Sequence, residues 1–416
     1  MKTKRRTTMC CDTNRSQLTA GRCSVVLLLG FFIAAAACAK PYVPPSDDEI
    51  LETLPRIASG AAPRSRSAVG SSTDFASALA DAANYLSAAR ASGDPRYLGY
   101  AQARLNRWWT APTPPPAIAL LRAQIHQHNH DFGAALADLD YVAIHDPRNT
   151  QVHLTRAAIE QVQGNYDAAQ AECRRLALLA APLMTVECLS RIASYRGHAR
   201  EAYDRLFALR ERSQGADRDQ MRELDVTLAD IAVRLGDARA AERHYRSALD
   251  AGADSYVLAA WADFLLSQRK FGAVLDLRRR YIDHPDLLLR AAIAARETSS
   301  PDADVLAERL RSQYAAHRQR GDFTPSRDYA RFLLDIERNA PAALDAALFN
   351  WRTQREPSDA RIVLDAAIAS GRIEAAAPVI EFVRRNRLED VRLEKLVSIG
   401  ERSGSSSKTR MVELAP

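Results

Sequence analysis

The sequence predicts an all-α protein built from repeated helical hairpins, and three observations support this class. Alanine- and leucine-rich segments of roughly 12 to 16 residues alternate with short breaks between residues 73 and 400. The same part of the chain has almost no alternating β-branched runs and no Asn-Gly turns, which are the usual signals of strands. A similar residue pattern also returns about every 34 positions, which indicates stacked units of similar size.

The repeat is clearest when residues 122–135 are aligned with residues 156–169. The segments RAQIHQHNHDFGAA and RAAIEQVQGNYDAA share Arg, Ala, Ile, Gln and the two closing alanines. His130 aligns with Gly164 just past the first helix, where a left-handed backbone favours glycine and tolerates histidine. Small residues recur at the matching position of successive units: Ala135, Ala169, Ala202, Ala241 and Val274.

Both ends of the array are less regular. Residues 74–109 predict a first hairpin, broken at Gly93 and with Pro95 at the start of its second helix. Residues 328–357 and 360–386 predict late hairpins, whereas residues 299–324 fit the pattern poorly. We expect about eight hairpins between residues 73 and 400.

A period near 34 residues with two helices per unit resembles the tetratricopeptide repeat. In that family a small residue of helix A packs against a small residue of helix B, an aromatic residue lies three positions before the latter, and proline often closes the unit. The matching residues here are the pairs Ala123/Ala135, Ala157/Ala169 and Ala229/Ala241, the aromatics Phe132, Tyr166 and Phe271, and the prolines Pro147, Pro182 and Pro285. The resemblance implies a right-handed superhelical solenoid of stacked hairpins.

The resemblance also implies a partner-binding groove on the concave face, lined by helix A of each unit. Its lining would suit a peptide or helix of another protein, and it lacks the clustered Lys and Asn of grooves that clamp C-terminal carboxylates. Arg122 and Arg156 depart from the family, because their positions are usually apolar. Carried over position by position, the polar groove residues are Gln124, His128, Gln151, Thr155, Gln161, Glu223, Asp230, Arg234, Tyr256 and Asp263.

The histidines of IHQHNHDFGAAL form the one cluster that suggests a reactive site. His126 and His130 lie four residues apart on a helix and could grip a metal ion, with His128 nearby. The repeat instead assigns His130 to a turn and His126 to a packing position, so we expect no metal and no other cofactor. The sequence also lacks a G-x-S-x-G elbow, a phosphate-binding loop and an H-E-x-x-H motif. We therefore expect no enzyme activity.

Most of the formal charge of +6 lies in residues 1–37, which hold six basic side chains against Asp12. The remainder carries about +1, too little to predict a nucleic-acid partner. This basic segment precedes the apolar run SVVLLLGFFIAAAACA, in the order of a secretory signal. We expect a signal peptide over 1–39, a Pro/Ser-rich flexible linker over 40–72, the solenoid over 73–400 and a disordered tail over 401–416.

Two processing routes fit the end of the signal. Cleavage before Lys40 would release a soluble protein, whereas the stretch Ala35-Ala36-Ala37-Cys38 resembles a lipidation site that would tether the chain to a membrane. Both routes lead out of the cytoplasm, into the periplasm of a bacterium. Cys173 and Cys188 are then either two buried thiols or a disulfide between neighbouring helices.

These observations together predict a non-catalytic scaffold of the bacterial cell envelope, whose partner is another envelope protein or peptide. A metal-binding protein or enzyme built on the three histidines is one alternative. A structural subunit that self-associates through its end hairpins is another. The sequence does not indicate an oligomeric state.

Overall fold

The computed structural model describes residues 71–180, 182–213, 215–282, 284–321, 323–400 and 402. In these ranges the chain is helical and contains no strand, from α1 (Ser71–Ser92) to α19 (Ala377–Asn386) and a further helix over residues 391–400. None of these helices is long and apolar enough to cross a membrane. The predicted signal, Cys38, nearly all of the linker and most of the tail lie outside the described residues.

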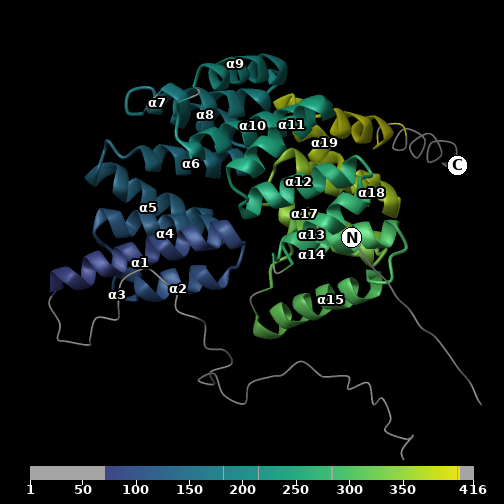
Figure 1. The fold of residues 1–416 in the computed structure, drawn as a ribbon, viewed down its shortest axis with the longest axis horizontal. Helices are drawn as coiled ribbons and strands as arrows, with labels where there is room; N and C mark the ends of the chain where they lie inside the picture. Colours follow the sequence, from purple (N-terminus) through teal and green to yellow (C-terminus); the bar gives the residue numbers. More distant parts are fainter. Residues whose placement is uncertain are drawn as a thin grey trace, which may run out of the picture. The chain divides into compact units, whose positions relative to one another are not determined.

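Successive helices pack in pairs along the chain (Figure 1). The first pairs are α1 with α2 (Arg96–Arg104), α4 (Pro116–His128) with α5 (Phe132–His145), α6 (Thr150–Val162) with α7 (Tyr166–Leu176), α8 (Pro182–Ser194) with α9 (Ala199–Arg212) and α10 (Arg218–Leu235) with α11 (Ala238–Ala251). The later pairs are α12 (Ser255–Ser267) with α13 (Phe271–Arg280), α14 (Leu287–Glu297) with α15 (Ala303–Arg320), α16 (Arg327–Arg331) and the π-helix Phe332–Ile336 with α17 (Ala340–Trp351), and α18 (Pro357–Ser370) with α19. The all-α hairpin architecture is confirmed. The described residues have one pair more than expected, because residues 299–324 contain the whole of α15.

One type of turn closes the regular hairpins. His130 has a φ of 59°, and the N–H of Asp131 donates to the carbonyl of His126 at 2.9 Å. Gly164 has a φ of 77°, and the equivalent bond from Asn165 to Glu160 measures 2.8 Å. These bonds satisfy carbonyls in the last turn of α4 and of α6. The predicted left-handed turn at His130 is confirmed.

The small residues lie where the two helices of a hairpin cross. Ala123, Ala135, Ala157, Ala169, Ala229 and Ala241 are each at most 1% exposed. The absence of longer side chains lets the helices approach closely, while leucines and aromatics fill the space around the crossing. Arg122 fits its usually apolar position because it is half-buried and binds Asp138 at 2.5 Å.

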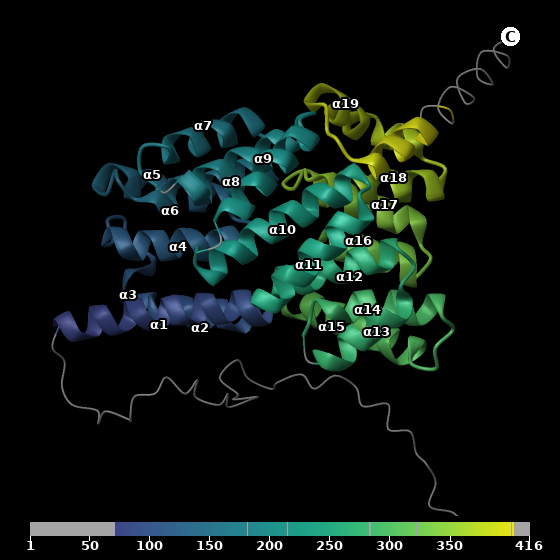
Figure 2. The same ribbon diagram turned by 45° about the horizontal axis from the view of Figure 1, so that its top comes forward.

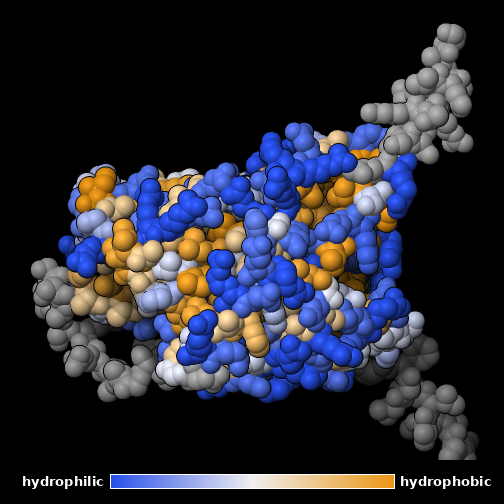
Figure 3. Space-filling view, turned by 90° about the horizontal axis from the view of Figure 1, so that it is seen from above, coloured by the Kyte–Doolittle hydropathy of each residue, from blue (hydrophilic) through white to orange (hydrophobic). Residues whose placement is uncertain are grey.

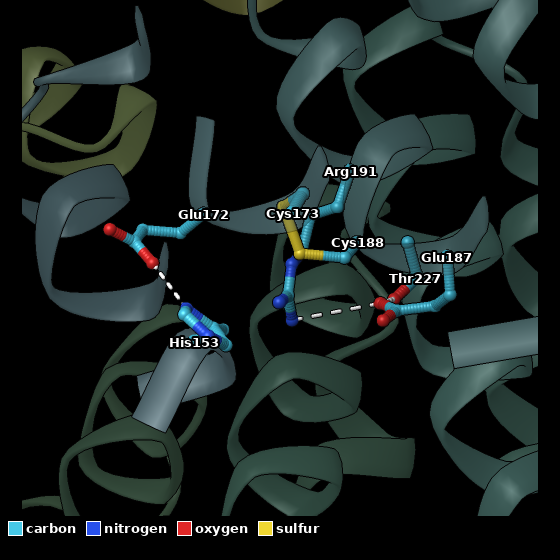
Figure 4. Close-up of a disulfide and its surroundings, with 7 residues drawn as sticks. All are labelled: His153, Glu172, Cys173, Glu187, Cys188, Arg191 and Thr227. Atoms are coloured by element: carbon cyan, nitrogen blue, oxygen red, sulfur yellow. Dashed lines mark hydrogen bonds and ion pairs between the residues drawn. A yellow bond between two sulfur atoms is a disulfide. The ribbon is translucent and has the colours of Figure 1, made fainter. Parts of the chain in front are cut away.

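A disulfide joins two neighbouring hairpins (Figure 4). Cys173 in α7 and Cys188 in α8 are bonded and completely buried, so these residues form the bridge rather than two free thiols. A hydrogen bond between His153 and Glu172 at 2.7 Å and an ion pair between Arg191 and Glu187 at 3.6 Å flank the bridge. The covalent link fixes α8 against α7 at a junction between repeats.

The solenoid turns back on itself, so that α17–α19 lie beside helices far earlier in the sequence (Figures 1 and 2). The N–H of Arg355 donates to the carbonyl of Val162 at 2.7 Å. Phe382 packs on Tyr166 and Trp351, with ring centroids 6.4 and 5.2 Å apart. One continuous buried cluster therefore joins α6–α8 to α16–α19.

Two further contacts close the same turn of the superhelix. Glu389 accepts a hydrogen bond at 2.8 Å from the N–H of Ala199, the first residue of α9. At the other end, Gly93 after α1 lies so close to Ser255 and Asp286 that a Cβ atom there would be 2.8 Å from each side chain. The concave face is thus enclosed by the chain itself, an arrangement that the sequence pattern does not predict.

Candidate functional site: a closed central channel

Three adjoining cavities lie along the enclosed concave face. Together we call these three cavities the central channel. An inner chamber of about 260 Å³ lies between α10, α12, α16 and α18. A mouth cavity of about 590 Å³ lies near the end of α1 and the α4–α5 turn, and a side pocket of about 190 Å³ lies between α6, α8, α10 and α12. Tyr256 lines all three cavities, which explains why this aromatic residue keeps 59% of its surface exposed.

The channel gathers most of the groove residues that the resemblance implies. Gln161, Glu223, Asp230, Arg234 and Tyr256 line the side pocket, Asp263 lines the inner chamber, and His128 lines the mouth cavity. The other three lie elsewhere. Gln124 is half-buried in α4, Gln151 is exposed at the start of α6, and Thr155 is 7% exposed among packed helices.

Several of the gathered residues are held by other parts of the chain. Arg234 is 5% exposed and donates to the carbonyl and hydroxyl of Ser194, each at 2.6 Å, while its guanidinium lies 4.2 Å from the centre of the Tyr195 ring. Arg234 therefore positions Tyr195 in the channel wall and is not free to bind a partner.

Asp263 is likewise part of an internal ion network. It binds Arg290 at 2.9 Å and Arg331 at 2.6 Å, and Arg290, which is only 3% exposed, also pairs with Asp328. Burial alone would raise the pKa of Asp263, but the two guanidinium groups outweigh burial and hold its pKa well below the usual range. Asp263 stays ionised and serves to join α12, α14 and α16.

Asp230 differs from Asp263 in its surroundings. Its carboxylate accepts hydrogen bonds from the hydroxyls of Tyr245 at 2.7 Å and Tyr256 at 2.6 Å, and it lines both the inner chamber and the side pocket. Burial raises the pKa of Asp230, and the two hydroxyls counteract only part of that rise. The carboxylate is thus fixed in direction at the junction of two cavities.

The late hairpins supply channel residues that the sequence analysis missed. Arg290, Arg327, Arg331 and Glu356 line the inner chamber. They come from units where the repeat is irregular, so no register assigned them to a groove. One signal was present, since Arg290 lies within the apolar stretch LLLRAAIAA, where a single charged residue indicates a buried ion pair.

The three histidines do not converge on a shared point. His126 lies against the ring of Trp109, with centroids 5.2 Å apart, and approaches Asp131 at 3.3 Å. His130 occupies the turn beside Phe132, and both His128 and His130 line the mouth cavity. In the described part of the chain, no group of three or more His, Cys, Asp and Glu side chains is arranged to hold a metal ion.

Exposed apolar side chains do not suggest a competing binding face. Ile144, Leu178, Ile282 and Val305 are each more than 60% exposed, but they belong to different hairpins or connecting loops. On the face in Figure 3, hydrophobic patches are broken up by hydrophilic side chains. The enclosed channel is the most organised polar site among the described residues.

Comparison with known proteins finds likeness in repeat architecture. No family model and no curated protein matches the chain. Among solved structures, the P58(IPK) TPR domain is 14% identical, covering 80% of this chain and 99% of that chain with a TM-score of 0.25. A tetratricopeptide repeat protein from Parabacteroides merdae is 10% identical (79% and 99% covered, TM-score 0.30), and yeast Tom70 is 9% identical (82% and 100% covered, TM-score 0.27).

The hairpins, their spacing and their buried alanine crossings make the chain a tetratricopeptide-like α-solenoid. Its own particular feature is that the concave face is enclosed by the last hairpins of the same chain.

Proposed function

We propose that the protein is a non-catalytic interaction scaffold that holds an extended segment of another protein in its central channel. The observation that carries this proposal is the meeting of residues from α4, α6, α10 and α12 around Tyr256, at positions where the repeat family presents side chains to ligands. Internal bonds hold many of these side chains in place, so a bound segment would meet a preorganised surface and lose little affinity to ordering it.

The proposal is tested by placing a photocrosslinking phenylalanine derivative at Tyr256 in cells that make the protein. We expect a covalent adduct whose partner segment maps to the channel. Phe349, which is 41% exposed and does not line the channel, is the matched control position. Adducts at Phe349 with none at Tyr256 would show that another surface binds partners.

The place of action is proposed to be the bacterial cell envelope. The signal-like residues 1–39 support export, and the Cys173–Cys188 bridge is of the kind that persists in oxidising compartments. Released protein should begin at Lys40, and membrane-tethered protein should begin at a lipidated Cys38. Mass spectrometry of the mature N-terminus distinguishes the two, and a protein retained in the cytoplasm with its first residues intact would contradict export.

A further inference from the structure

The side pocket contains two polar atoms that are buried without a hydrogen-bond partner. Gln161 is 7% exposed, its Nε2 donates weakly to the hydroxyl of Tyr195 at 3.4 Å, and its Oε1 accepts nothing. Arg191 lines the same pocket, and its Nε donates to nothing. Buried polar atoms are nearly always paired, so the unpaired acceptor of a residue that lines the pocket points to a ligand that donates a hydrogen bond.

The carboxylate of Asp230 lies in the same wall and lacks a direct cationic partner. Its only hydrogen bonds in the described part of the chain come from Tyr245 and Tyr256, which are neutral. Arg234 and Arg191 act on it at longer range, in contrast to the two guanidinium groups bound directly to Asp263. A charge in this position is compensated best by a cation that enters the pocket.

The composition of the wall favours the same ligand. Four carboxylates line the side pocket, and only two guanidinium groups do. Both guanidinium groups are engaged elsewhere, Arg234 with Ser194 and Arg191 with Glu187. Tyr256 adds an aromatic ring, whose face attracts cations.

The size of the pocket restricts what can enter. Its volume of about 190 Å³ lies below the range of about 300 to 1,000 Å³ that is usual for small-molecule sites. A single long side chain fits this space, whereas a helix does not. Because the side pocket and the inner chamber share Asp230 and Tyr256 in their walls, such a side chain can belong to a segment lying in the channel.

We propose that the side pocket binds the ammonium or guanidinium group of a lysine or arginine carried by the segment that the channel holds. This inference rests on the proposed scaffold function. The cation donates to Gln161 Oε1 and to the Asp230 carboxylate.

The test uses the full chain and two synthetic probes, acetyl-Ala-Lys-Ala-amide and the same peptide with norleucine in place of lysine. Isothermal titration should detect binding of the lysine peptide, with the norleucine peptide at least about tenfold weaker because it cannot donate to the carboxylate. The variant D230N should weaken binding of the lysine peptide by a similar factor, and Q161L should weaken this binding several-fold. D276N removes an exposed carboxylate paired with Arg279 on α13, outside the channel, and should bind as the wild type does.

Equal binding of both peptides would overturn the inference, and so would unchanged binding by Q161L and D230N. If D230N does not fold, Q161L decides the question, since it loses only one weak hydrogen bond. The crosslinking experiment at Tyr256 separates the two proposals. A trapped segment without lysine or arginine near the adduct would overturn the cation pocket and leave the scaffold intact, whereas no trapped segment would contradict the scaffold itself.

Discussion

Asp359 shows how one buried side chain links stability to pH. It is completely buried, its Oδ2 accepts from the N–H of Glu356 at 3.0 Å, and its Oδ1 accepts from Asn350 at 3.0 Å. Burial raises the pKa of Asp359 to about 6, partly offset by Arg327 and reinforced by Glu356. Because this pKa exceeds the value of about 4 expected in the unfolded chain, the folded state binds the proton more tightly, and the resulting stabilisation is full below about pH 4 and is lost as the pH rises through about 6.

The variant D359N should remove this dependence while keeping an acceptor for Glu356. We expect the free energy of unfolding of the wild type, relative to D359N, to rise by about 2 to 3 kcal/mol as the pH falls from 7 to about 4. Denaturant titrations at several pH values measure the free energy of unfolding of both proteins. Taking the difference between them cancels the effects of the acidic residues that they share. A difference that stays constant over this range would contradict the raised pKa.

At the scale of single residues, the sequence predicts what recurs and misses what occurs once. The crossing alanines and the left-handed His130 are predictable because each repeats a position seen in other units. Arg122 departs from that pattern, and its role becomes clear only with Asp138, 16 residues later. Such a pairing between two helices leaves no periodic trace in the sequence.

At the scale of elements, the disulfide is the only covalent link between hairpins in the described residues. It closes a loop of 15 residues between α7 and α8, for which restriction of the unfolded chain contributes about 3 kcal/mol. The double variant C173S/C188S should therefore unfold at a clearly lower temperature than the wild type. Reducing agent should lower the unfolding temperature of the wild type to the same value. Thermal unfolding followed by circular dichroism measures both. A reductant-insensitive wild type would contradict the bridge.

The contact of α19 with the α6–α7 turn provides a second test at this scale. Gly164 and Gly371 both have a left-handed backbone, with φ of 77° and 69°. A Cβ at Gly164 would lie 2.4 Å from Cζ of Phe382, whereas a Cβ at Gly371 meets no atom within 4 Å. G371A should lower the free energy of unfolding by only about 1 kcal/mol, the cost of placing alanine in a left-handed backbone. G164A should pay the same cost and should also displace Phe382.

Hydrogen exchange distinguishes these two variants. In G164A the amides of α19 should exchange markedly faster than in the wild type, because the helix loses its close contact with the earlier hairpin. In G371A the amides of α19 should keep their protection. Equal protection of α19 in both variants would show that the contact at Gly164 does not hold this helix.

At the scale of the whole solenoid, the enclosure of the concave face could not be predicted from the sequence. The repeat period fixes how neighbouring hairpins pack, but the enclosing bonds join residues about 190 positions apart, such as Ala199 with Glu389. Small rotations between many hairpins add up to decide whether the ends meet. The same limit applies to the site: the predicted helix-A positions supply seven residues of the channel wall, whereas the late hairpins that complete the wall carry no clear register.

The measurement that tests this enclosure most directly is disulfide trapping between α8–α9 and the segment after α19. A Cβ at Gly197 would lie 3.6 Å from Cβ of Arg387, within the range of about 3.5 to 4.5 Å that a disulfide spans. The account predicts that G197C/R387C forms this bond within one molecule under mild oxidation, as seen by non-reducing peptide mapping, and that the control G371C/R387C does not. Cysteines 197 and 387 that stay free, or that join only different molecules, would contradict a solenoid closed by its own last hairpins.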